Sequence, residues 1–234
     1  ASAAAEKAAE ILGRALVGKK SVRLIAATGN AQLKFLNQLR KRKDIDWSRI
    51  TLFHLDEYIG IGKEHPASFA GYIQEKIVDS FHPGKAYLLN GVASSPEAER
   101  KRVSALVAET PVDVAFVGIG ENGHLAFNDP PADFETEEPY IIVDLDERCR
   151  NQQVGEGWFL GMDDVPKQAF SMSIKQIMKS AHIIAIVPEK RKAEAVSLCL
   201  AKDAELTPKH PASILKSHSH VDIYLDKDSA SLLV

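Results

Sequence analysis

Residues 111–130 read PVDVAFVGIGENGHLAFNDP, and this stretch decides the fold. It begins with β-branched and apolar residues at 112–117, which are typical of a buried strand. Gly118, Gly120 and Gly123 follow directly, as glycines do where a strand ends in a sharp turn or where the backbone approaches a ligand closely. In an open α/β sheet, ligands bind at the carboxyl ends of the strands. We therefore expect a binding site at this strand end.

Three polar side chains lie just beyond the same strand end. They are Asn122, His124 and Asp129. Histidine titrates near neutral pH and a nearby carboxylate can orient its ring, so these three side chains form a candidate acid/base site. A plain strand–turn element with a solvated His124 fits the spacing as well.

The composition bounds the class of protein. The chain has 234 residues, 45% of them hydrophobic, with 29 basic and 32 acidic side chains and a net charge of −3. This balance gives no nucleic-acid footprint and no basic patch for a membrane surface. Cys149 and Cys199 form no disulfide framework or metal-ligand spacing, which favours a reducing, cytoplasmic setting. No apolar run approaches the roughly 18 residues of a membrane span, and residues 3–17 form an amphipathic helix, not a signal peptide.

Strand and helix patterns alternate along the chain, which predicts an α/β fold with a doubly wound, mostly parallel sheet and helices on both faces, in a single domain over residues 1–234. The expected strands are 21–26, 50–55, 87–89, 112–117, 140–143, 170–174, 182–187 and 221–225. The expected helices are 3–17, 32–42, 68–79, 96–109, 174–180, 189–200 and 211–215.

Two further strand ends carry functional candidates. Thr28, Gly29 and Asn30 form a small-residue turn between a strand and a helix, where free N–H groups and the helix dipole favour an anion such as phosphate. An ordinary helix start fits this turn equally well. Asp56 and Glu57 follow the strand at 50–55, and burying two acids costs energy unless something uses them. A solvent-facing pair is the alternative for these two.

The chain resembles the glucosamine-6-phosphate deaminase (isomerase) family over residues 5–228. The resemblance rests on LDEY at 55–58 and GIGENGHLAFNDP at 118–130. The sister family, 6-phosphogluconolactonase, continues with Ala-Ser-Leu-Phe-Pro where residues 126–130 read AFNDP, and it has Arg in place of Tyr58. Both differences favour the deaminase.

The resemblance implies conversion of glucosamine 6-phosphate and water to fructose 6-phosphate and ammonia, with no metal and no cofactor. Asp56 would take the C2 proton, and His124 would move the proton in ring opening. Asp129 would support His124, and Asn122 would hold the tautomer of that ring. Glu57 and Gly123 are expected among the substrate-binding residues.

At the phosphate end the chain departs from the family pattern. The resemblance places phosphate on Thr28, Gly29 and Asn30, with Lys192 supplying charge. Many members have a phosphate-binding Arg where this chain has Gln153, and Arg150, one turn away, is the expected substitute. Loss of the guanidinium fork would lower phosphate affinity.

Two other functions stay open at this point: a lactone hydrolase of the sister family, and a sugar-phosphate-binding protein with a degraded site. The expected partner is a small sugar phosphate, with no nucleic acid and no membrane. Large relatives are hexamers activated by an N-acetylated amino-sugar phosphate. Their basic residues are replaced here by acids at 135–138, so we expect no such activation and a monomer or small homo-oligomer.

Overall fold

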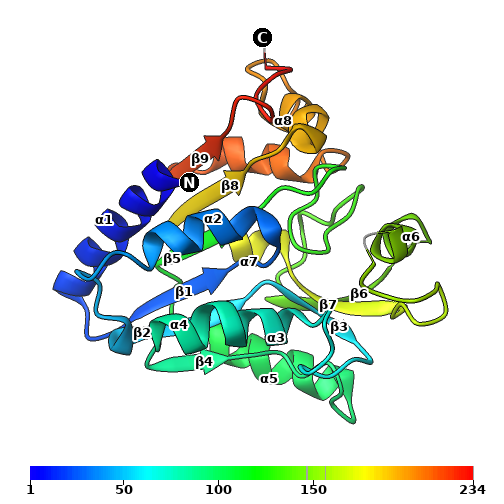
Figure 1. Ribbon diagram of the computed structural model, residues 1–234, viewed down its shortest axis with the longest axis horizontal. Coiled ribbons are helices and arrows are strands. Elements are labelled where there is room, and N and C mark those ends of the chain that lie inside the picture. Colours follow the sequence, from blue (N-terminus) through cyan, green and yellow to red (C-terminus); the bar gives the residue numbers. More distant parts are fainter. Residues whose placement is uncertain (146, 156, 234) are drawn as a thin grey trace.

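A six-stranded parallel sheet forms the centre of the computed structural model, which describes residues 1–145, 147–155 and 157–233 (Figure 1). Its spatial order is β4-β2-β1-β5-β8-β9. The strands are β1 (Val22–Ala26), β2 (Ile50–His54), β4 (Lys85–Tyr87), β5 (Val114–Val117), β8 (His182–Val187) and β9 (Val221–Leu225). All five neighbouring pairs run parallel, which confirms the predicted sheet.

The order of strands places a crevice beside β1 and β5. The chain builds the sheet outward from β1 in one direction through β2 and β4, and in the other through β5, β8 and β9. Leu24 pairs with Val114 and Ile25 with Ala115 across the reversal. In doubly wound sheets the ligand crevice lies at this reversal, outside the carboxyl ends of the strands. The turn after β1 and the glycine-rich loop after β5 therefore meet at one edge.

Helices cover both faces of the parallel sheet. They are α1 (Ser2–Gly18), α2 (Asn30–Leu39), α3 (Phe69–Ile73), α4 (Asp79–Phe81), α5 (Pro96–Ala108), α7 (Ile174–Met178) and α8 (Ala193–Leu200). A further helix, α6 (Glu147–Gly155), lies away from the parallel sheet (Figure 1). A π-helical turn, Gln74–Val78, joins α3 to α4, and 3-10 turns lie at Trp47–Arg49, Lys190–Lys192 and Pro211–Ser217. Ser68 caps helix α3, because its hydroxyl accepts a hydrogen bond from the Gly71 N–H at 3.1 Å.

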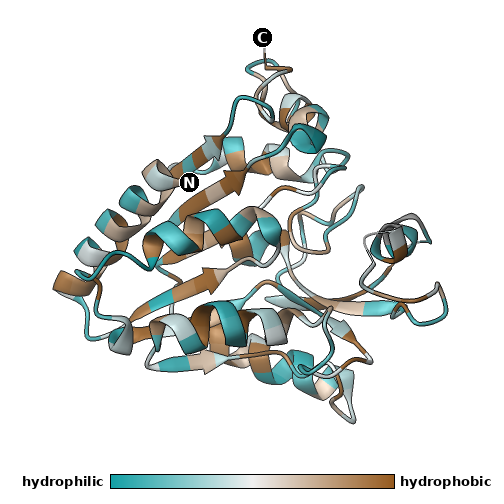
Figure 2. Cartoon of the chain, in the orientation of Figure 1, coloured by the Kyte–Doolittle hydropathy of each residue, from teal (hydrophilic) through white to brown (hydrophobic). Residues whose placement is uncertain are grey.

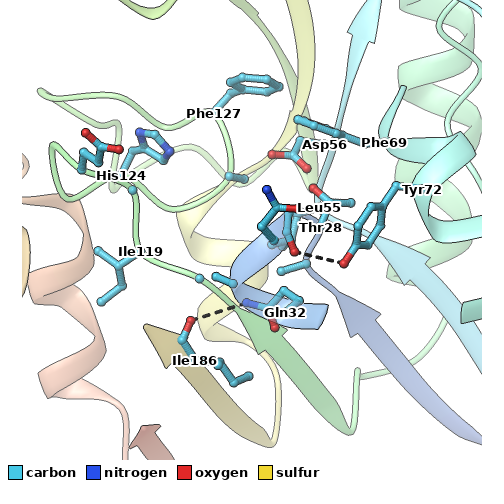
Figure 3. A pocket seen from close by; sticks show the side chains of 18 of the residues that line it. Thr28, Gln32, Leu55, Asp56, Phe69, Tyr72, Ile119, His124, Phe127 and Ile186 are labelled. Carbon is cyan, nitrogen blue, oxygen red and sulfur yellow. Dashed lines mark hydrogen bonds between the residues drawn. The ribbon is translucent and has the colours of Figure 1, made fainter. Parts of the chain in front are cut away.

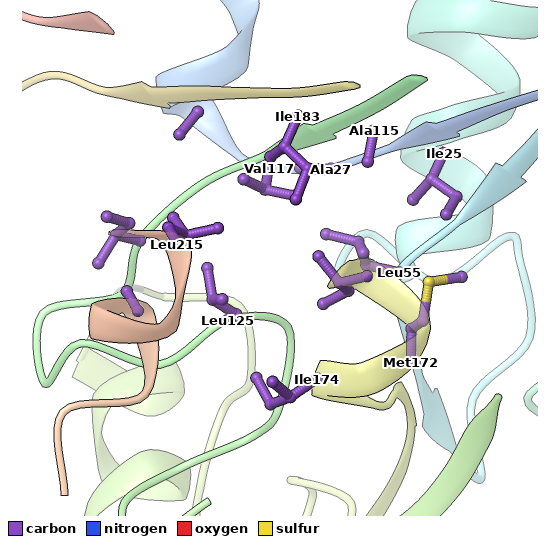
Figure 4. Packing of buried hydrophobic residues seen from close by; sticks show 14 of the residues in the cluster. Ile25, Ala27, Leu55, Ala115, Val117, Leu125, Met172, Ile174, Ile183 and Leu215 are labelled. Carbon is purple, nitrogen blue, oxygen red and sulfur yellow. The ribbon is translucent and has the colours of Figure 1, made fainter. Parts of the chain in front are cut away.

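The core divides into two layers, because successive strand residues point to opposite faces. Leu24 and Val114 face the layer beneath α1, α2 and α3. Ile25 and Ala115 face the layer that contains α5, α7 and α8, and Figure 4 shows their side chains close to those of Val117 and Ile183. Figure 2 shows the apolar residues gathered on the central strands.

A second, three-stranded antiparallel sheet was not predicted. It consists of β3 (Asp56–Ile59), β7 (Gln168–Met172) and β6 (Tyr140–Asp144) in the order β3-β7-β6. In Figure 1 it lies beyond the carboxyl ends of the parallel strands. Two hydrogen bonds join it to β2 and the residue that follows β2: Met172 N–H donates to the Leu55 carbonyl at 2.6 Å, and the Tyr140 hydroxyl donates to the His54 carbonyl at 2.5 Å.

Several predicted elements are shifted. The strand expected at 170–174 is observed as β7, and the helix expected at 32–42 is observed as α2. The expected strand at 87–89 is observed as β4, Lys85–Tyr87. The helix expected from residue 189 begins at Ala193, after the 3-10 turn Lys190–Lys192. Glu189 has φ 83° and ψ 140°, which no α-helix can accommodate. Among the helices that the structure describes, none has both the length and the apolar character to cross a membrane.

Gly91 packs against the backbone at the end of β3, and we expect a larger residue there to destabilise the fold. A Cβ added there would lie 2.4 Å from the carbonyl oxygens of Tyr58 and Ile61, which are backbone atoms that cannot move independently. Gly91→Ala should therefore lower the melting temperature by ~4 °C or more, since local strain of this kind costs ~1–3 kcal/mol.

Gly13→Ala is the matched control, because its added Cβ meets nothing within 4 Å inside helix α1. This change should raise stability by roughly 0.5–1 kcal/mol. Equal melting temperatures for the two variants in thermal unfolding would contradict the packing at Gly91.

Candidate active site

A cavity of about 260 Å³ opens at the crevice beside β1 and β5. Its walls come from the loops after β1, β5 and β8, from β3, and from α3, as Figure 3 shows for part of the lining. Asp56 and His124 both line it, although 68 positions separate them in the chain. The predicted convergence of these two side chains on one cavity is therefore observed.

Asp56 is the first residue of β3 and lies on the wall of the cavity with only 8% of its surface exposed. Burial raises the pKa of its carboxyl group to about 8, and the charge of neighbouring Glu57 adds to the rise. The group therefore changes protonation near neutral pH, as a general base or acid must.

His124 is oriented by Asp129. The His124 Nδ1 and Asp129 Oδ1 atoms are 3.0 Å apart. The pKa of Asp129 is lowered: burial raises it, but the hydrogen bonds and charge from His124 and Asn122 outweigh burial. Asn122 acts at a different point from the one expected, because its amide donates to Asp129 Oδ1 at 2.8 Å and its oxygen accepts from the His124 backbone N–H at 3.1 Å.

Gly120 packs directly beneath the imidazole ring of His124. A Cβ at Gly120 would lie 2.3 Å from His124 Nε2, so no other residue fits there while the ring holds its position. The glycine after β5 is thus explained by a close approach of backbone and side chain. His124 also lines the cavity, with its Nδ1 atom 3.0 Å from Asp129 Oδ1.

Asn128 and Ser171 connect the histidine loop to the small sheet. Ser171 lies opposite Asp56 in the β3–β7 pair, and its hydroxyl accepts from the Phe127 N–H at 3.0 Å. The buried Asn128 amide donates to the carbonyls of Leu125 and Met172 at 2.7 and 2.8 Å. Strand β7 therefore contacts both the strand that carries Asp56 and the loop that carries His124.

Glu57 does not line the cavity. Its carboxylate accepts hydrogen bonds from the Ser68 hydroxyl at 2.6 Å and the Ala70 N–H at 2.7 Å, and from the N–H groups of Tyr58 and Phe69 at 2.8 and 3.1 Å. Burial raises its pKa, and these hydrogen bonds oppose the rise. The structure thus places Glu57 under the start of α3, away from the substrate position that the sequence suggested.

The expected anion-binding turn lies at one end of the cavity. Thr28, Gly29 and Asn30 all line it, and Gly29 has φ 98°, which favours glycine. Helix α2 begins at Asn30, so its first N–H groups point toward this end. The Tyr72 hydroxyl, from α3, donates to the Gly29 carbonyl at 3.0 Å and fixes the turn (Figure 3).

Of the other residues expected to bind phosphate, two line the cavity and one does not. Lys192 and Gln153 line the cavity. Arg150 does not: its guanidinium donates to the carbonyls of Met162 and Val165, at 2.5 and 3.0 Å. Gly123, expected among the substrate-binding residues, does not line the cavity, and a Cβ added there would lie 2.9 Å from the Cys199 sulfur. The side chain of Cys149 lies outside the part that the structure describes.

Sequence reasoning missed several residues of the cavity wall. They are Gln32, Tyr72, Glu121, Trp158 and Arg191. Arg191 belongs to the basic run at 190–192, which in the sequence resembles the solvated first turn of a helix. In the structure the backbone at Glu189 turns the chain, and this run forms a separate 3-10 turn. Over residues 1–145, 147–155 and 157–233, no group of three or more His, Cys, Asp or Glu side chains is arranged to hold a metal ion.

Comparison with known sequences identifies similar proteins over nearly the whole chain. A family model described as glucosamine-6-phosphate isomerases/6-phosphogluconolactonase matches residues 1–224. A glucosamine-6-phosphate deaminase of Streptococcus pyogenes serotype M1 is 37% identical over 207 residues, which cover 88% of this chain and 86% of the relative. A glucosamine-6-phosphate deaminase of Bacillus cereus (strain B4264) is 35% identical over 228 residues, covering 97% and 84%.

Solved structures agree with this picture. A monomeric glucosamine-6-phosphate deaminase aligns with a TM-score of 0.86 at 31% identity, over 98% of this chain and 95% of that one. A 6-phosphogluconolactonase from Shewanella baltica OS155 aligns with a TM-score of 0.75 at 20% identity, covering 94% and 90%. At this lower identity the second likeness shows a shared fold alone.

Glu57→Gln is expected to destabilise the protein. The amide group would replace one acceptor oxygen with a donor, so at least one of the three backbone N–H groups or the Ser68 hydroxyl loses its partner in a buried site. We expect a loss of ~1–3 kcal/mol and a fall of ~2–12 °C in melting temperature. Glu64→Gln, at an exposed position seven residues later, should change stability by less than ~0.5 kcal/mol. Equal behaviour of the two variants would contradict the buried clamp.

Asp56→Asn is expected to change how stability depends on pH. The folded pKa is about 8, whereas an unfolded aspartate titrates near ~3.9. Between these values the folded protein holds the extra proton, so the contribution of this group is fully present below about pH 4 and is lost as pH rises to about 8. The melting temperature of the variant relative to wild type should therefore rise across this window, by ~4 °C or more.

Thermal unfolding followed from pH 4.5 to pH 9 checks this expectation. Asp203→Asn, at an exposed position, serves as the matched control and should give a difference from wild type that does not vary with pH. A difference for Asp56→Asn that is equally flat would show that this carboxyl group has no raised pKa.

Proposed function

Because the chain belongs to the family of glucosamine-6-phosphate isomerases and 6-phosphogluconolactonases, we propose that it converts glucosamine 6-phosphate and water to fructose 6-phosphate and ammonia. It would act as a hydrolase of a C–N bond in cytoplasmic amino-sugar catabolism, as a monomer or small homo-oligomer. One observation carries the proposal: a carboxyl group that titrates near neutral pH and a carboxylate-oriented imidazole line the same cavity.

Ring opening falls to His124. Its Nδ1 atom lies 3.0 Å from Asp129, which favours the tautomer with the proton on Nδ1 and leaves Nε2 to accept a proton. The imidazole would take the proton of the C1 hydroxyl group and return it to the ring oxygen as the C1–O bond to that oxygen opens. The Asp129 carboxylate stabilises the imidazolium that exists between the two transfers.

Isomerisation falls to Asp56. The ionised carboxylate would take the proton from C2 of the open-chain aldehyde and return it to C1. Over the same steps one proton passes from the substrate ammonium group to the C1 oxygen, so that the enol-type intermediate becomes a sugar with a hydroxyl group at C1 and an iminium group at C2. Water then adds at C2, and ammonia leaves with the ketose as the second product. In the empty cavity Asp56 holds its proton below about pH 8, and the ammonium group of the substrate would favour its ionised form.

Two features favour deamination over lactone hydrolysis. The curated relatives at 35–37% identity carry the name deaminase, whereas the lactonase structure is only 20% identical. In addition, Asp56 is buried, and its pKa of about 8 suits removal of a carbon-bound proton, a step that lactone hydrolysis lacks.

A coupled assay for ammonia and fructose 6-phosphate tests the proposal. Wild type should release both in equal amounts, and Asp56→Asn should lower kcat by ~10²-fold or more, because the amide cannot accept the proton. The kcat/KM of wild type should rise with pH through about 8, as free Asp56 ionises. Asp203→Asn is the control for a carboxylate remote from the cavity.

Other outcomes of the same assay would replace the proposal. Turnover of 6-phosphogluconolactone without release of ammonia would indicate the lactonase reaction. Tight binding of sugar phosphates without turnover of either substrate would indicate a binding protein.

A further inference from the structure

Arg191 lies in the wall of the cavity that the turn after β1 and the start of helix α2 also line. We propose that Arg191 is the residue that selects phosphorylated sugars in this chain, and that its ion pair with Glu121 exchanges for the phosphate when substrate binds. The inference rests on the proposed function for the nature of the substrate, a hexose 6-phosphate. It assigns a role that neither the motifs nor the expected phosphate residues gave to this position.

The guanidinium of Arg191 is already arranged around carboxylate oxygens. Its Nη1 atom donates to Glu121 at 2.9 Å and its Nε atom donates to Glu189 at 2.6 Å. These two acids belong to different loops, one after β5 and one after β8. A planar fork that binds carboxylates binds phosphate oxygens through the same donors. The side chain therefore has anion-binding geometry at the rim of the cavity before any substrate arrives.

The backbone before Arg191 holds it toward the cavity at a conformational cost. Glu189 has φ 83° and ψ 140°, a region that residues other than glycine rarely adopt. Its N–H donates to Asp226 Oδ2 at 3.0 Å, and its carboxylate binds Arg191. Strain of this kind persists where the surroundings fix it, most often at functional sites. The conformation sends the chain into a 3-10 turn, so that Arg191 and Lys192 both reach the cavity wall.

No other arginine lines the cavity in the part of the chain that the structure describes. Arg150, the substitute expected from the sequence, donates to two backbone carbonyls elsewhere. Gln153 lines the cavity but is neutral, and Lys192 supplies a compact charge without a fork. Among the arginines whose side chains the structure describes, Arg191 is therefore the one placed to make a bidentate contact to phosphate in this cavity.

Glu121 and the phosphate compete for the same donor. Glu121 also lines the cavity and is exposed, so its carboxylate can leave the pair at little cost, whereas Glu189 stays fixed by its own backbone. An incoming dianion brings more charge than the carboxylate and adds the N–H groups at the start of α2. The Glu121 pair thus holds Arg191 in place in the empty cavity and weakens binding of anions that carry less charge than phosphate.

Calorimetric titration of the whole chain with glucose 6-phosphate tests the inference without requiring turnover. Arg191→Gln should raise Kd by ~10- to 100-fold, since charge-assisted hydrogen bonds are lost. Arg191→Lys should recover only part of the affinity, because it lacks the fork. Glu121→Gln should lower Kd by ~3-fold or more, because the competing carboxylate is gone.

Arg42→Gln is the matched control, because Arg42 also pairs with a carboxylate, Asp44, through two nitrogens at 3.0 and 2.7 Å, but remote from the cavity. Thermal unfolding of each variant confirms that it is folded. Equal Kd for wild type and Arg191→Gln, with Arg42→Gln unchanged, would overturn the role of Arg191 and leave the proposed function intact. Weaker binding by Glu121→Gln would overturn the exchange. A wild type that binds no hexose 6-phosphate would overturn the proposed function itself.

Discussion

Strand alternation at β3 is the constraint on which the site depends. Successive residues of a strand point to opposite sides, so two adjacent, buried carboxyl groups have opposite surroundings. Glu57 points to the start of α3 and accepts hydrogen bonds from four donors. Asp56 points into the cavity, where burial dominates and its pKa rises to about 8. One carboxylate stabilises the fold, and its neighbour is left poised for chemistry.

The small antiparallel sheet turns this local contrast into a site. Strand β7 pairs with β3 along the whole length of β3, and its Ser171 and Met172 accept hydrogen bonds from the loop that carries His124. The base and the imidazole therefore share one rigid neighbour, although they come from segments far apart in the sequence. The anion-binding end is built separately, from the turn after β1, from Tyr72 and from the turn after β8.

The sequence was informative where one physical signal dominated. Continuous apolar runs predicted β1, β2, β5 and β8, and the carboxyl ends of such strands meet at one edge, so Asp56 and His124 were correctly brought to one cavity. The charged residues that open β3 have low strand propensity, so the sequence did not predict this strand. It forms because pairing with β7 outweighs that propensity.

Contacts between distant segments explain the remaining misses. The four donors to Glu57 lie up to 13 residues away, and the carbonyls that hold Arg150 lie 12 and 15 residues away, so no local pattern revealed them. The sequence did not predict that Arg191 lines the cavity, because residue type alone does not reveal the positive φ of Glu189.

The bonds from Met172 to Leu55 and from Tyr140 to His54 tie both sheets together directly beside Asp56. Three of the four partners lie in strands, and Leu55 is the single residue that joins β2 to β3. Insertions, deletions and exchanges in the loops that shape the rest of the cavity can therefore accumulate without disturbing the position of the Asp56 carboxyl group. In such an architecture, changes in the loops can alter which ligand the cavity prefers, while the strands keep Asp56 in the same position.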